Sequence, residues 1–140
     1  MKIYWDTSAV INAIISPAVM KLIQSGEHFT RAHTLAEFFS RMTGRGVRWA
    51  DENGEMNHLI LDADVVTEWL KTFTNSVKLV ELTGPEILDW ISQARKKGVQ
   101  GGRVHDLLHA AAAEKAGAEK ILSRNLGDFA GLSSIPAAMP

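Results

Sequence analysis

The sequence predicts an α/β fold in which a mainly parallel sheet is covered by helices on both faces. Short apolar segments alternate along the chain with longer segments whose apolar residues recur every three or four positions. This alternation is typical of parallel strands joined by crossover helices. The 140 residues contain no repeat, low-complexity tract or linker. Residues 1–140 are therefore expected to form a single domain.

The first part of the chain predicts one strand and two helices. Residues 3–5 are apolar and aromatic, as in a buried strand. A helix is expected over residues 9–15, with Ser8 as its N-cap. Proline suits the first turn of a helix but not its interior, so a second helix should cover residues 17–24 and end at Gly26.

A second strand is expected over residues 27–33, and a helix should run from Thr34 to about Gly44. The apolar face of that helix would consist of Leu35, Phe38, Phe39 and Met42. Residues 44–61 are harder to interpret, because two short apolar segments flank a turn-prone stretch at 51–54. Either a hairpin or a mobile loop fits this pattern, and the segment could be an insertion.

The central part of the chain predicts two further helices around a third strand. Asp64 is expected to cap a helix over residues 65–73, whose apolar face would be Val65, Val66, Trp69, Leu70 and Phe73. Residues 77–82 alternate well enough for a strand. A helix should follow over residues 85–97, with Ile87, Leu88, Ile91 and Ala94 facing inward.

The last third of the chain begins with a glycine-containing loop at residues 98–102. An alanine-rich helix is expected over residues 104–116, ending at Gly117. A fourth short strand should cover residues 119–123. The tail at 133–140 fits either a terminal strand or a loose end.

Composition excludes several classes of protein. The chain has no cysteine, which excludes disulfides, thiolate metal sites and a cysteine nucleophile. The net charge of −1 provides no overall basic field, so a nucleic-acid partner would need a local patch or a bound metal. No apolar run reaches the roughly 18 residues that span a bilayer, and the start of the chain lacks a signal-peptide pattern. A cytoplasmic protein without a membrane partner is expected.

Four acidic residues lie where a predicted strand meets a helix or turn: Asp6, Glu37, Asp106 and Asp128. Taken singly, each has a structural explanation, such as a turn, the first turn of a helix or a capping box between Thr34 and Glu37. In an open α/β sheet, however, such junctions can converge beyond the carboxyl ends of the strands. Four carboxylates brought together there would repel unless a cation lay between them. Hard ions such as Mg²⁺ and Mn²⁺ prefer this all-oxygen environment.

In order and spacing, the segments around these acids resemble the PIN-domain family over nearly the whole chain. Four segments carry the resemblance: Trp5-Asp6-Thr7-Ser8, Leu35-Ala36-Glu37-Phe38, Asp106-Leu107-Leu108-His109 before an alanine run, and Leu122-Ser123-Arg124-Asn125-Leu126-Gly127-Asp128-Phe129. Ser123 stands where threonine is commoner. The resemblance implies a PIN-like α/β/α domain.

The resemblance also implies a function, that of a metal-dependent endoribonuclease, often the VapC-like toxin of a type II toxin–antitoxin pair. One or two Mg²⁺ or Mn²⁺ ions would make a nucleophile from water and stabilise charge on phosphate oxygens. Asp6 and Asp106 would bind the metal directly or through water, and Asp128 would complete the site. Glu37 would be a further ligand or would orient the attacking water.

Other residues have supporting roles on this interpretation. Thr7, Ser123 and Asn125 could hold the carboxylates in place. Arg103 and Arg124 could contact phosphates, although ordinary surface charge is an equally good interpretation of both. Weaker candidates for the same role are Arg45, Arg48, Lys96 and Lys97.

The resemblance also bears on the role of His109 and on the partners of the protein. His109 occupies a position that is usually apolar in the family, so it either orients a carboxylate or packs as a structural histidine, and packing is the preferred interpretation. RNA is the expected substrate. A protein antitoxin and a homodimer are the expected protein partners.

Two alternative functions stay open. One is a nucleic-acid-binding module of the same fold that has lost catalysis, although the presence of all four acids argues against it. The other is a phosphatase that uses Asp6 as a covalent nucleophile. Such enzymes resemble Asp-x-Asp at this point, whereas position 8 here is serine.

Overall fold

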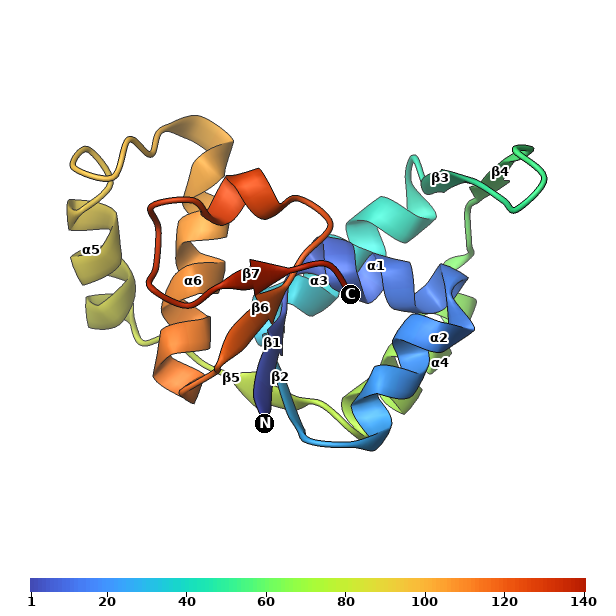
Figure 1. Ribbon diagram of the computed structural model, residues 1–140, viewed down its shortest axis with the longest axis horizontal. Coiled ribbons are helices and arrows are strands. Elements are labelled where there is room, and N and C mark those ends of the chain that lie inside the picture. Colours follow the sequence, from blue (N-terminus) through green and yellow to red (C-terminus); the bar gives the residue numbers. More distant parts are fainter.

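The computed structural model describes residues 1–140 and has a five-stranded parallel sheet at its centre (Figure 1). The strand order is β5-β2-β1-β6-β7, and every pair of neighbouring strands is parallel. The strands are β1 (Lys2–Trp5), β2 (Glu27–Arg31), β5 (Lys78–Val80), β6 (Lys120–Leu122) and β7 (Ala137–Ala138). The predicted α/β class and parallel sheet are therefore confirmed. The C-terminal tail forms the edge strand β7.

Six α-helices and three 3₁₀ turns connect the strands. They are α1 (Thr7–Ile15), α2 (Pro17–Met20) with η1 (Lys21–Gln24), α3 (Ala32–Thr43), α4 (Ala63–Thr74), α5 (Gly84–Ser92), η2 (Gly101–Arg103), α6 (Val104–Ala116) and η3 (Leu126–Phe129). No single helix is long and apolar enough to cross a membrane. Only α1 combined with α2 and η1 reaches that length and composition, across a bend of 118°.

Two hydrophobic clusters lie on the two faces of the sheet. Tyr4 and Trp5 are consecutive in β1, so their side chains point to opposite faces, and both are fully buried. Trp5 packs with residues of α1, α3 and α4, whereas Tyr4 packs with residues of α6. Figure 1 shows this division, with α1, α3 and α4 on one side of the strands and α5 and α6 on the other. Helices thus cover both faces, as predicted.

Three predicted helix starts are wrong by two residues. Asp6, not Ser8, caps α1, because its Oδ1 accepts the backbone N–H of Ala9 at 2.8 Å. Asp62, not Asp64, caps α4 in the same way. The strand β2 ends at Arg31 and α3 begins at Ala32, so Thr34 lies inside the helix.

The predicted capping box in α3 is therefore wrong. Thr34 is buried and its hydroxyl accepts a hydrogen bond from Thr30 at 2.9 Å. The carboxylate of Glu37 instead contacts Thr7 and His109, which come from other elements.

Some residues that the sequence predicts to face inward are exposed. The helix α5 ends at Ser92 rather than residue 97, and Leu88 is 68% and Ile91 41% exposed. This helix lies at the edge of the molecule beside α6, so only part of its surface is covered (Figure 1). Phe39 in α3 and Val65 in α4 are also exposed, because the neighbouring positions Phe38 and Val66 take the buried places.

Residues 44–61 form a hairpin, which decides between the two predicted alternatives. Its strands are β3 (Val47–Ala50) and β4 (Met56–Leu59), paired antiparallel and separate from the main sheet. The turn is held by Asp51, whose Oδ1 accepts the backbone N–H groups of Asn53 and Glu55 at 2.9 and 3.0 Å. Figure 1 shows the hairpin projecting beyond α1 and α3.

Candidate functional site

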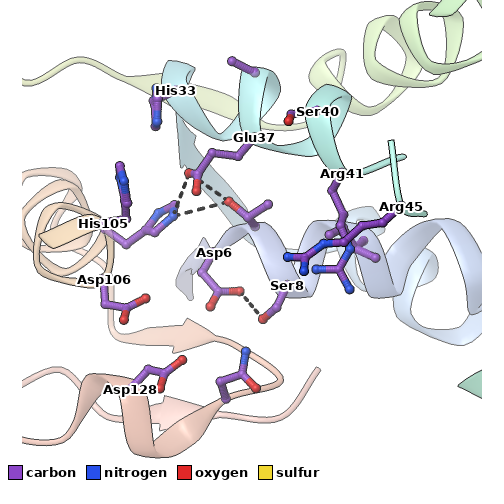
Figure 2. Close-up of a pocket in the computed structure, with 15 residues that line it drawn as sticks. Asp6, Ser8, His33, Glu37, Ser40, Arg41, Arg45, His105, Asp106 and Asp128 are labelled. Carbon is purple, nitrogen blue, oxygen red and sulfur yellow. Dashed lines mark hydrogen bonds and ion pairs between the residues drawn. The ribbon is translucent and has the colours of Figure 1, made fainter. Parts of the chain in front are cut away.

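A pocket of about 820 Å³ lies where the strands β1 and β2 lead into the helices α1 and α3. This is the edge of an α/β sheet at which ligands usually bind. The pocket is lined by all four acidic residues singled out in the sequence, Asp6, Glu37, Asp106 and Asp128 (Figure 2). They come from the end of β1, from α3, from the first turn of α6 and from η3.

Asp6 is held in place by its position between β1 and α1. Its side chain is 5% exposed, and its Oδ1 accepts hydrogen bonds from the Ala9 backbone N–H at 2.8 Å and from the Ser8 hydroxyl at 2.7 Å. Burial raises the pKa of this carboxyl above its ordinary value, and the nearby Ser123 hydroxyl, the Ala9 N–H and the Ser8 hydroxyl offset only part of the rise. A positive charge in the pocket would therefore stabilise ionised Asp6.

Ser8 and Ser123 connect this first segment to the end of β6. The Ser8 hydroxyl lies 3.3 Å from that of Ser123 and accepts the Arg124 backbone N–H at 2.9 Å. Ser123 is fully buried and its hydroxyl also accepts the backbone N–H of Asn125 at 2.9 Å. The side chain of Asn125 lines the pocket. Ser123 thus fixes the backbone that leads to Asp128.

Asp106 and Asp128 carry neighbouring negative charges. Burial, the charge of Asp128 and the charge of Asp6 together raise the pKa of Asp106 to about 6. His109 and Arg103 counteract this rise without cancelling it. Three carboxylates therefore lie close enough to repel, as expected of groups that share a cation.

We expect Asp106→Asn to stabilise the metal-free protein at neutral pH. Because the pKa of Asp106 is raised by folding, from 3.8 to about 6, its charge destabilises the fold above pH 6 but has no effect below pH 4. Asp106 is only half-buried, so solvent screening limits the effect to about 1 kcal/mol. In EDTA, the melting temperature of Asp106→Asn should exceed that of wild type at pH 7 and equal it at pH 4. Equal melting temperatures at pH 7 would contradict the raised pKa of Asp106.

Glu37 is held by a hydrogen-bond network that reaches the core. Its Oε1 accepts the Thr7 hydroxyl at 3.1 Å and lies 3.3 Å from Nε2 of His109. Nδ1 of His109 pairs with the buried Tyr4 hydroxyl at 2.7 Å. Burial alone would raise the pKa of Glu37, but the hydrogen bond and charge of His109, with Thr7, lower it to about 2. His109, 3% exposed, therefore both packs in the core and orients a carboxylate.

Neither of the two preferred arginines, Arg103 and Arg124, lines the pocket, whereas the weaker candidate Arg45 does, together with Arg41, which the sequence did not predict. Arg103 donates to the backbone carbonyl of Asp128 at 3.0 Å, which gives it a structural role, and Arg124 is exposed. Arg41 and Arg45 line the pocket instead, and Nε of Arg41 donates to the Gly46 carbonyl at 2.7 Å. Figure 2 shows Arg41 and Arg45 together, at the end of the pocket away from His33 and His105.

Two histidines that the sequence did not predict to belong to the site, His33 and His105, line the rim of the pocket. His33 and His105 are exposed, and their rings stack at 5.7 Å between centroids with 12° between planes. With Glu37 they form a group whose ligand atoms lie within 4.8 Å of one another, so this cluster could bind a metal ion. One signal was present in the sequence, because His33, Glu37 and Arg41 follow each other at intervals of four and so share one face of a helix.

Comparison of the sequence with protein-family models and with curated proteins gave no match. The molecule is an α/β protein with four carboxylates, three histidines and two arginines around one pocket.

Proposed function

We propose that this protein is a metal-dependent endoribonuclease with a PIN-like fold. The observation that carries the proposal is the convergence of Asp6, Glu37, Asp106 and Asp128 on one pocket at the end of the sheet. These residues come from four separate parts of the chain, and a purely structural role for each would not require them to meet. Such a pocket suits a polyanionic substrate only if a cation neutralises the acids.

The donor set fits Mg²⁺ or Mn²⁺. Asp6, Asp106 and Asp128 offer only oxygen ligands, and the pKa of Asp106 is raised by burial and then by the negative charges of Asp128 and Asp6. When bound, one or two such ions would supply an activated water and neutralise charge on phosphate oxygens. Asp6 is the most firmly positioned of the three, since the Ala9 N–H and Ser8 hydroxyl hold one of its oxygens.

The shifted pKa values favour different roles for Glu37 and Asp106. A proton acceptor works best when its pKa is near the working pH, and a group with a pKa of about 2 is a weak base. Glu37 therefore suits a ligand, or a group that orients water, held by Thr7 and His109. Asp106, whose pKa is raised to about 6 by burial and by the charges of Asp128 and Asp6, suits a direct metal ligand, because a bound cation would stabilise its ionised form.

Arg41 and Arg45 support the assignment of a nucleic-acid substrate. Guanidinium groups bind phosphate oxygens in a bidentate manner, and a chain with a net charge of −1 needs such a local patch. Both arginines line the same pocket as the acids, and Arg41 is anchored through Nε to Gly46. An RNA backbone that lies along the pocket could thus contact the arginines at one end and present a phosphate to the acids.

The test is cleavage of a panel of structured RNAs by the purified protein after treatment with EDTA. We expect no cleavage in EDTA and clear cleavage after Mn²⁺ or Mg²⁺ is added in excess. RNA binding without cleavage under all metal conditions would contradict the nuclease and favour the binding module. A phosphorylated aspartate at position 6, trapped from a phosphate-ester substrate, would favour the phosphatase.

A toxin role, a protein antitoxin and a homodimer are proposed only on the strength of the resemblance. The acidic pocket would attract a cationic side chain of an inhibitor, as charged interfaces do. Slower growth of cells that express the wild type alone, relieved by Asp6→Asn, is the corresponding test. Normal growth with abundant wild-type protein would contradict the toxin role but leave the nuclease untouched.

A further inference from the structure

The rim cluster of His33, Glu37 and His105 has a different chemistry from Asp6, Asp106 and Asp128, which we call the floor acids. His33 and Glu37 lie one turn apart on α3, and His105 comes from the first turn of α6. Figure 2 shows His33, Glu37 and His105 together on one side of the pocket, with Asp106 and Asp128 on the other. Two imidazole nitrogens and one carboxylate oxygen form a ligand set typical of Zn²⁺, whereas Mg²⁺ prefers oxygen alone.

The hydrogen bonds of Glu37 leave one of its oxygens free for a metal. Both contacts, from Thr7 at 3.1 Å and from His109 at 3.3 Å, go to Oε1. Oε2 has no hydrogen bond and is not among the buried unpaired atoms. A carboxylate that is oriented through one oxygen while the other binds the ion is the usual arrangement around protein metal sites.

The distances require only a small closing movement. The three ligand atoms lie within 4.8 Å of one another. A tetrahedral ion with bonds of about 2.0 Å would hold its ligand atoms roughly 3.3 Å apart. His33 and His105 are both exposed, so their rings can rotate to meet the ion, while Glu37 stays anchored by Thr7 and His109.

We propose that His33, Glu37 and His105 form a Zn²⁺ site with water in the fourth position. Such an ion would link α3 on one face of the sheet to α6 on the other, across the mouth of the pocket. Only these three side chains are needed, so zinc binding does not depend on nuclease activity. Because Glu37 belongs to both groups, zinc would also occupy the free oxygen of this carboxylate, which could then not bind a metal shared with Asp6, Asp106 and Asp128.

The test is zinc affinity, measured on the full-length protein after EDTA treatment by competition with a chromogenic chelator. His33→Ala and His105→Ala should each weaken zinc binding by at least about 100-fold, since loss of even a supporting contact costs 10–100-fold. Two control variants should bind zinc like wild type. His58→Ala removes an exposed histidine of the hairpin, and Asp128→Asn removes the charge of an acid outside the rim cluster.

Thermal unfolding in EDTA checks that each variant is folded. If an alanine variant does not fold, His33→Gln and His105→Gln replace it, because glutamine keeps the polarity and approximate size of the side chain. Unchanged zinc affinity in either rim variant would overturn the proposal. So would loss of zinc binding in Asp128→Asn, since that result would assign the ion to the acids. Neither result bears on RNA cleavage, which is measured separately.

Discussion

Asp6→Asn is expected to lower the rate of RNA cleavage by roughly 10³-fold while the fold survives. A metal-bound carboxylate site contributes several kcal/mol of charge stabilisation, and each 1.36 kcal/mol corresponds to a factor of ten. Asparagine keeps the size of the side chain and a carbonyl oxygen that can still accept the Ala9 N–H. The charge is lost, whereas the N-cap of α1 is retained. Initial rates at saturating Mn²⁺ measure the effect.

The matched control is Asp89→Asn on α5, which removes the same charge from an exposed position outside the pocket. It should cleave RNA at the wild-type rate. Thermal unfolding of both variants shows whether the fold is intact. If a folded Asp6→Asn variant kept more than a tenth of the wild-type rate, Asp6 would not belong to the catalytic site.

Trp5→Ala is expected to reduce the free energy of unfolding by about 3–5 kcal/mol, as is typical when a large buried aromatic residue is truncated. Trp5 is fully buried, packs edge to face on Phe73 and donates its Nε1–H to Nδ1 of His28 at 2.9 Å. Its loss leaves a cavity between β1 and α4 and an unpaired buried histidine nitrogen. Because Asp6 is the next residue, the site should loosen as well. Urea unfolding at constant pH measures the effect.

Trp90→Ala serves as the comparison. Trp90 lies on the edge helix α5, is only half-buried and is covered in part by the Lys97 side chain, 4.5 Å from its ring. Trp90→Ala removes less buried apolar surface than Trp5→Ala, so it should reduce the free energy of unfolding by clearly less. Equal losses in the two variants would contradict the assignment of Trp5 to the centre of the core.

The order of strands and helices could be predicted from the sequence because local patterns determine it. The alternation of short apolar strands and amphipathic helices is visible along the chain, and the parallel sheet follows from it. The caps could not be predicted as reliably, because neighbouring residues compete for the same role. Asp6 and Ser8 can both cap a helix, and Ser8 instead pairs with Ser123, 115 residues away.

The four acids could be predicted because each lies beside a local pattern that is visible in the sequence. Asp6 and Asp128 come soon after the strands β1 and β6, Glu37 lies on the helix after β2, and Asp106 opens an alanine-rich helix. The structure brings all four to one pocket. Arg45 and His105 have no such signal, since their place in the pocket depends on how α3, the hairpin and α6 pack. The network around Glu37 likewise depends on the contact between Tyr4 and His109, which are 105 residues apart.

The measurement that tests the central claim most directly is the end-group chemistry of RNA cleaved in a Mn²⁺ titration. If water activated at the acidic pocket attacks the phosphate, the 2′-hydroxyl of RNA takes no part in the reaction. We therefore predict cleavage that is absent in EDTA, rises with free Mn²⁺ and leaves no 2′,3′-cyclic phosphate. A substrate with 2′-O-methyl groups at the cleavage site should still be cut. Cleavage that persists in EDTA, or products with cyclic phosphate ends, would contradict a metal-dependent nuclease.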